Sequence, residues 1–235
     1  MVGIIHLKND LKQILRDPIM AILIVAPLLL ITAFKLILLY LVPYIQTLIE
    51  FNVLPYLDYV LVFVVMMCGA MLGIVTGFMM IDDRDGKIAE LMSVTPLGRS
   101  GYLINRLLFA AVLSVFYSIL GFYVLNVVEL PIITILFVSL LSSIYSVIIG
   151  LLIFIFADDK VKGLTFAKAI NSLSLFAFTD LLALKWLTVL SWFFPPYWIS
   201  LVVQSPHTFV NYGLALSVNF GWLFLLIRHY WKKES

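Results

Sequence analysis

The sequence of 235 residues has few charged side chains, a single cysteine and three histidines. Charged residues make up 12% of the chain and hydrophobic residues 63%, which is more apolar material than one water-soluble core of this length can bury. Much of the chain must therefore be solvated by a lipid bilayer. Because Cys68 stands alone, an intramolecular disulfide and a cysteine-based metal cluster are excluded.

Sequence motifs for nucleotide, metal and nucleic-acid binding are missing as well. There is no Gly-x-x-x-x-Gly-Lys-Ser/Thr, so the chain cannot hold ATP through a P-loop of its own. The histidines lie at the termini or in the last external loop, without a second ligand at zinc-binding spacing. No basic block interleaved with aromatic residues points to nucleic acid. We therefore expect no catalytic residue, cofactor or metal in this chain.

Long apolar runs predict an all-α integral membrane protein with six transmembrane helices. Each run reaches the roughly 20 residues that a helix needs to cross the hydrocarbon core. The runs cover 19–42, 57–81, 101–127, 132–157, 163–184 and 208–227. Residues 1–17 are too interrupted by charge for a signal peptide, and their apolar residues recur at helical spacing. We predict an amphipathic helix in the membrane interface there; a frayed basic tail is the alternative.

Residues 185–207 are apolar and aromatic, but Pro195-Pro196 divides them into two pieces too short to cross the membrane. We interpret them as a re-entrant external hairpin, with a seventh, broken span as the alternative. Six spans place every basic residue except Lys35 and Lys185 on one side, which the positive-inside rule makes cytoplasmic. We thus expect a plasma-membrane protein with both termini in the cytoplasm. Lys35 is interpreted as reaching the far interface, with a substrate role as the alternative.

Small residues recur at helical spacing within the spans. Gly69, Gly73 and Gly77 repeat every four residues, which predicts close packing against another helix, in the same chain or in a second copy. Weakly polar residues of the fourth and fifth spans are candidates to line a transport pathway; they are Ser142, Ser146, Asn171 and Ser174. For the serines, helix packing with hydroxyls bonded to backbone carbonyls is the alternative.

The longest polar interruption, at 82–100, separates the second and third spans. We predict that this loop carries a short amphipathic helix from about Gly86 to Val94, capped by Asp85 and ended by Pro96. A rod of this kind between two spans can transmit rigid-body motion. Lying passively on the membrane surface is the alternative.

An acidic cluster of Asp82, Asp83 and Asp85 stands beside the glycine of this loop. It imitates an EF-hand, but the first aspartate and the bidentate glutamate of that motif are absent. It also resembles the opening of the CDP-alcohol phosphotransferase motif, whose downstream aspartates are missing here. A lipid-modifying enzyme that uses this cluster is therefore kept as an alternative.

The loop and the order of the spans resemble the type 2 ABC export permeases. The matching loop residues are Arg84, Gly86, Glu90, Leu91, Thr95, Pro96 and Arg99, and an aromatic-proline segment at 194–198 precedes the last span. The resemblance implies a type V ABC exporter-like fold. It also implies two partners besides membrane lipids, namely a second permease copy or paralogue and an ABC ATPase that carries the ATP and Mg.

In this family the first cytoplasmic loop is a coupling helix that contacts the ATPase. The resemblance assigns that contact here to Gly86, Lys87, Ile88, Glu90, Leu91, Met92, Thr95 and Pro96. We therefore predict the permease subunit of an ATP-driven exporter, which is not itself an enzyme. A non-transporting anchor or immunity protein that binds its partner through the same loop is a further alternative. The resemblance does not fix the substrate.

Overall fold

The computed structural model describes residues 13–14, 16–48, 52–88, 91 and 98–234, and every regular element within them is a helix. The α-helices are α2 (Pro18–Leu36), α3 (Val42–Leu48), α4 (Leu57–Asp85), α6 (Gly98–Leu125), α7 (Ile132–Phe156), α8 (Lys160–Ser172), α9 (Lys185–Ser191), α10 (Pro195–Gln204) and α11 (Phe209–Glu234). A π-helix, η1 (Ile37–Leu41), joins α2 to α3, and two 3-10 helices are η2 (Leu54–Tyr56) and η3 (Leu173–Leu182). The predicted all-α class is confirmed for these residues, while most of the predicted interfacial helix at 1–17 lies outside them.

Five helical stretches are long and apolar enough to cross a membrane. They are Pro18–Leu48, Leu54–Asp85, Ser100–Leu125, Ile132–Phe156 and Phe209–Lys232. A sixth would be the pair α9 and α10, which meet at a bend of 107°, if the pair is one broken span. Pro195 starts α10 rather than interrupting it, as expected for a proline at the first helical position. Whether the pair is a broken span or a re-entrant hairpin stays a prediction.

The predicted fifth span, 163–184, is not one continuous α-helix. α8 ends at Ser172 and continues directly into the 3-10 helix η3, which ends at Leu182 and is followed by Ala183 in the left-handed conformation. With rises of 1.5 and 2.0 Å per residue the two helices together extend about 40 Å, which is sufficient to cross the hydrocarbon core. Its length is therefore sufficient, and the segment differs from the five long spans in its lower apolar content, since Lys168, Asn171 and Asp180 lie within it.

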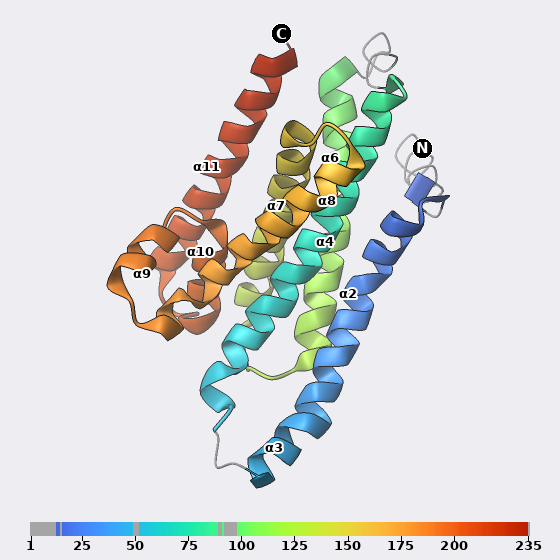
Figure 1. Ribbon diagram of the computed structural model, residues 1–235. Coiled ribbons are helices and arrows are strands. Elements are labelled where there is room, and N and C mark those ends of the chain that lie inside the picture. The colour runs from blue at the N-terminus through green and yellow to red at the C-terminus, as the bar shows by residue number, and fades with distance from the viewer. Residues whose placement is uncertain (1–12, 15, 49–51, 89–90, 92–97, 235) are drawn as a thin grey trace.

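α4 is the central helix of the bundle and packs against α2, α6 and α7 (Figure 1). In the most apolar stretch of α4, 78% of the residues are buried, against 11% for α2 and 17% for α11. α2 and α11 therefore form the periphery of the bundle and expose apolar side chains, as lipid-facing helices do.

The three glycines of α4 face α7 of the same chain. A Cβ on Gly73 would lie 2.4 Å from the carbonyl oxygen of Ser146 and 2.7 Å from the Cβ of Ile149. One on Gly69 would lie 2.8 Å from the Ser142 hydroxyl, and one on Gly77 would lie 2.8 Å from Cβ of Ile153. Only glycine permits this separation of the two backbones, so the neighbour that the sequence left open is α7.

The start of α2, the end of α4, the start of α6 and the end of α11 all lie at one end of the bundle (Figure 1). We refer to it as the loop end, because the segment between α4 and α6 lies there. Toward the opposite end, Lys35 Nζ donates a hydrogen bond of 3.0 Å to the carbonyl oxygen of Leu125. This lysine therefore binds the last turn of α6, where an ammonium complements the free carbonyls of the helix.

Replacing Gly73 by alanine tests the close approach of α4 and α7. We expect Gly73→Ala to lower the free energy of unfolding by about 1–3 kcal/mol, since a backbone carbonyl must move away from the new methyl group. The control is Gly221→Ala on α11, where no atom lies within 4 Å of the added Cβ and alanine favours the helix. Thermal unfolding in detergent should show a lower midpoint for the first variant alone; equal midpoints would contradict the packing.

Candidate functional site

The segment between α4 and α6 begins later than the sequence predicts. α4 continues through Asp85, and Gly86 closes it by donating its N–H to the carbonyl oxygen of Asp82 at 2.9 Å. The prediction that Asp85 caps a helix beginning at Gly86 is therefore wrong: Asp85 is the last residue of the preceding helix. α6 likewise starts at Gly98, earlier than predicted. The polar residues at these boundaries looked like loop because the sequence does not show the partners that allow them to stay helical.

One turn of the predicted coupling helix lies within the described residues. Lys87 has a positive φ of 54° and redirects the chain after α4. Ile88 and Leu91 are helical, and Leu91 N–H donates to the carbonyl oxygen of Lys87 at 3.2 Å. Their side chains are 37% and 65% exposed, so this turn presents apolar groups at the loop end. The predicted contacts Glu90, Met92, Thr95 and Pro96 lie outside the described residues.

A buried ion pair joins α4 to α6 directly beneath this turn. Asp83, whose side chain is fully buried, accepts hydrogen bonds from Arg106 at 2.6 and 2.9 Å and from the Tyr102 hydroxyl at 2.8 Å. Arg106 also donates to the side-chain oxygen of Gln13 at 3.2 Å, which lies just before α2. The bidentate geometry fixes both the distance and the orientation of the two helices.

The next residue of α4, Arg84, binds the end of α7. Its guanidinium donates to the carbonyl oxygens of Ala157 at 3.0 Å and Asp158 at 2.6 Å, and it lies 5.4 Å from the centre of the Phe154 ring. These carbonyls follow the last turn of α7 and have no partner within that helix. A cation at this position therefore satisfies them and complements the helix dipole.

The residue before the buried pair, Asp82, binds the start of α8. Lys160 Nζ lies 2.8 Å from Asp82 and 2.5 Å from Asp17, which caps α2 by accepting from the N–H groups of Ile19 and Met20. Burial by itself raises the pKa of Asp17. The hydrogen bonds from Lys160 and the two N–H groups outweigh it, so the pKa lies below its usual value. The carboxylate thus stays charged and holds α2 and α8 together.

We call the residues of these three contacts the end network: Asp17, Asp82, Asp83, Arg84, Tyr102, Arg106 and Lys160. The end network connects α2, α4, α6, α7 and α8 at the base of the segment that contains Ile88 and Leu91. Asp82 and Asp83 have cations as partners, so the acidic cluster is not a set of free carboxylates. Within the described residues no group of His, Cys, Asp and Glu has the arrangement of a metal site.

The candidate pathway residues occupy two separate places. Ser142 is buried between helices, 3.1 Å from the Ser114 hydroxyl and 3.3 Å from the carbonyl oxygen of Val65, while Ser146 donates to the carbonyl oxygen of Ser143 in its own helix. The serines of α7 thus serve the contact between helices in this single chain. Ser174 lies 3.1 Å from the Tyr145 hydroxyl, and Asn171 lies nearby at the end of α8.

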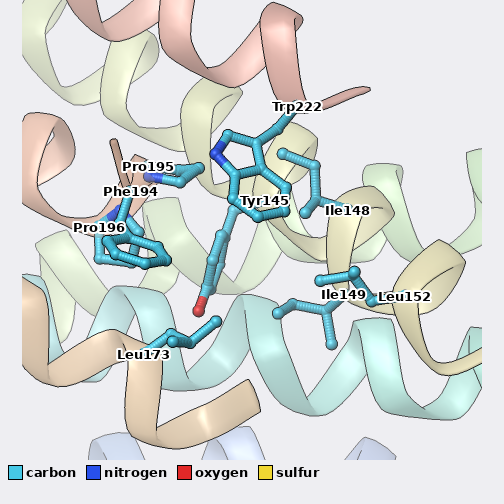
Figure 2. Close-up of a pocket in the computed structure, with 9 residues that line it drawn as sticks. All are labelled: Tyr145, Ile148, Ile149, Leu152, Leu173, Phe194, Pro195, Pro196 and Trp222. Carbon is cyan, nitrogen blue, oxygen red and sulfur yellow. The ribbon is translucent and has the colours of Figure 1, made fainter. Parts of the chain in front are cut away.

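The Tyr145 ring borders a small apolar cavity between α7, α10 and α11 (Figure 2). The Tyr145 hydroxyl points toward Leu173 at the start of η3, and Trp222 covers the cavity from α11 (Figure 2). At about 10 Å³ the cavity has room for about one water molecule. It cannot hold a drug-sized ligand.

Sequence reasoning missed the partners that complete the end network. The sequence places Arg106 and Lys160 only among the cytoplasmic charges, and it gives no role to Tyr102. Tyr102 and Arg106 are four residues apart, so they share one face of the helix that begins at the loop. This spacing was the available signal, but the sequence does not tell which acidic residue they meet.

Comparison with known proteins gives one consistent match. The family model described as fluoroquinolones export permease protein Rv2686c-like matches residues 10–230. The fluoroquinolones export permease proteins Rv2686c and MT2760, from the H37Rv and CDC 1551 strains of Mycobacterium tuberculosis, are each 24% identical to this chain. Each alignment of 239 residues covers 97% of this chain and 93% of the relative. No solved structure gives a significant match. The resemblance to export permeases is confirmed by these matches.

Removing Asp83 should be costly because it leaves a nearly buried guanidinium without its carboxylate. We expect Asp83→Ala to lower the free energy of unfolding by about 3–5 kcal/mol, and Asp83→Leu combined with Arg106→Met to recover most of that loss. The matched control is Lys162→Ala, which breaks an exposed pair with Asp158 and should behave like the wild type. Thermal unfolding in detergent measures all three; a midpoint for Asp83→Ala equal to that of the control would refute the structural role of the pair.

Proposed function

We propose that this chain, which belongs to the Rv2686c-like family of fluoroquinolones export permeases, is the membrane subunit of an ATP-driven exporter. A separate ABC ATPase supplies ATP and Mg, and contacts the permease at the turn that contains Ile88 and Leu91. The observation that carries this proposal is the end network, because it connects that turn to five helices at once.

The end network supports transmission of motion from the loop to the spans. A force applied at Leu91 reaches α4 through Gly86 and Lys87, and α4 is bound by ion pairs to α6 and α8. The bidentate pair of Arg106 and Asp83, and the contact of Lys160 with two carboxylates, fix the geometry between helices more strictly than apolar contact does. We therefore propose that the helices at the loop end move together when the ATPase closes.

A second permease copy or paralogue is part of this proposal. The cavity beside Tyr145 is far smaller than the 300–1,000 Å³ of a typical drug site, and the α7 serines are occupied by packing. A hollow of about 710 Å³, lined by Tyr123, Asn126 and Glu129 among others, lies between the end of α6 and the start of α7, away from the loop end. Because it is at one end of the bundle, we propose that the path through the spans lies between two copies. The relatives are named for fluoroquinolones, and we propose that this chain also exports drug-sized aromatic compounds.

A charge at Leu91 tests the contact with the ATPase. We expect Leu91→Asp to reduce ATPase binding and ATP-driven transport of norfloxacin into inside-out vesicles by at least about tenfold, since an apolar anchor would be replaced by a carboxylate. The matched control is Leu54→Asp, an equally exposed leucine toward the opposite end of the bundle. Normal ATPase binding and transport by the first variant would contradict the coupling contact. ATPase binding without transport by the wild type would favour an anchoring protein.

We further propose that the loop end faces the cytoplasm, as the distribution of basic residues suggests. The only native cysteine, Cys68, is fully buried and provides a silent background for labelling. In intact cells a membrane-impermeant maleimide should label Leu54→Cys but neither Asp85→Cys nor Lys232→Cys. The last two should react in inside-out vesicles. Labelling of Asp85→Cys in intact cells would reverse the orientation.

A further inference from the structure

α8 has a buried face of small and apolar residues and an exposed face that contains a charged residue. Gly163, Ala167 and Ile170 are buried, and α8 packs on α4 and α7. The exposed residues on the other side recur at helical spacing; they are Thr165, Lys168, Ala169 and Ser172. The Thr165 and Ser172 hydroxyls donate to the carbonyl oxygens of Val161 and Ala169 in their own helix, at 3.3 and 2.6 Å. The charge of Lys168 has no such partner, and a charge that faces hydrocarbon is costly, so this residue needs water or an anion.

This polar face lies alongside the membrane-spanning part of α7. A Cβ on Gly163 would meet the rings and side chains of Phe78 and Ile153, close to the loop end. Ser174, eleven residues further on, lies beside Tyr145, which is about 17 Å from the end of α7 along its axis. Lys168 lies between these two levels, and therefore within the depth of the hydrocarbon core.

Lys168 is a cation without a partner in the described part of the chain. No hydrogen bond or ion pair to a described residue reaches its ammonium group, whereas Lys160 on the same helix has two carboxylates. On the flank of the face, the Oδ1 atom of Asn171 is enclosed and also has no hydrogen-bond partner among the described residues. Within the described residues, the ammonium of Lys168 is thus a charge that no carboxylate balances.

The exposed face of α6 is different. Along α6 the exposed positions are Ile104, Leu108, Val112 and Phe116, all of them apolar and spaced by four residues. This is the pattern of a helix in contact with lipid. On α8, by contrast, Thr165, Lys168 and Ser172 are exposed among the described residues.

We infer that the exposed face of α8 lines a water-filled path and that Lys168 binds the acidic group of an amphipathic organic acid within it. The inference rests on the proposed export function and adds a substrate class to it. A carboxylate would neutralise the ammonium, and Phe166 and Leu175 supply exposed apolar surface beside it. Aromatic drugs that carry a carboxylate have both properties.

Thiol accessibility tests whether the face is in water. Ser172→Cys and Val112→Cys place a cysteine on exposed positions of α8 and α6, roughly 18 and 21 Å from the loop-end starts of their helices. In membrane vesicles that hold the permease with its ATPase, water-soluble methanethiosulfonates should modify Ser172→Cys at least about tenfold faster, because only ionised thiols react. Equal slow reaction at both positions would overturn the inference.

The charge of the reagent tests Lys168 itself. The anionic sulfonatoethyl reagent should modify Ser172→Cys faster than the cationic trimethylammonioethyl reagent, since Lys168 lies one helical turn away. Adding Lys168→Gln should reduce this preference by about tenfold, and Lys168→Arg should retain it. A preference that Lys168→Gln leaves unchanged would show that the ammonium lies elsewhere, for example at lipid headgroups, and would overturn its role.

Protection by ligand tests the substrate class. Norfloxacin should slow the modification of Ser172→Cys, and its methyl ester, which lacks the carboxylate, should not. Equal protection by both compounds, or by neither, would overturn the assignment of an acid-binding role to Lys168. The labelling does not require ATP hydrolysis. A chain that labels as expected but transports nothing would therefore contradict the proposed function and leave the site standing.

Discussion

The buried pair of Asp83 and Arg106 is the constraint on which the arrangement at the loop end depends. Both charges lie at the edge of a medium that cannot solvate them, so each needs the other in a fixed geometry. Successive residues of a helix point about 100° apart, and Asp82, Asp83 and Arg84 are consecutive. For this reason one turn of α4 reaches three neighbours: Asp82 binds α8 through Lys160, Asp83 binds α6, and Arg84 binds the end of α7. Three polar residues that resemble a loop in the sequence are thereby the point where the helices are joined.

The same helix is held in a different way along its apolar length. Gly69, Gly73 and Gly77 bring the backbone of α4 against α7, so van der Waals contact over several turns replaces the ion pairs of the loop end. The pair α4 and α7 is therefore fixed at its end by charge and along its length by shape. α2 and α11 are bound less closely, and most of their surface is left to lipid. A displacement that begins at Leu91 would consequently move the centre of the bundle before its periphery.

Most of the helices could be predicted from the sequence, because a bilayer requires long apolar helices. Apolar length alone located four of the spans to within a few residues at most ends, and the glycine spacing identified a packing face. The predicted start of the loop at Asp82 is wrong, because α4 continues to Asp85. Asp82 and Asp83 stay helical with the help of Lys160 and Arg106, which are distant in sequence. The first span was predicted to end at 42 but continues through a π-helix to Leu48. The change from α8 to η3 has no signal in the hydrophobic pattern, because both helix types expose a face at similar spacing.

Two lysines of α8, Lys160 and Lys168, lie in very different surroundings. Lys160 lies between the carboxylates of Asp17 and Asp82, so its charge is balanced by its neighbours. Lys168 lies eight residues deeper, where hydrocarbon would solvate it worse, yet no described carboxylate approaches it. A chain selected only to fold in lipid would gain stability from an apolar residue at that position. The water-filled path proposed above would account for this ammonium, because water and a passing anion would solvate its charge.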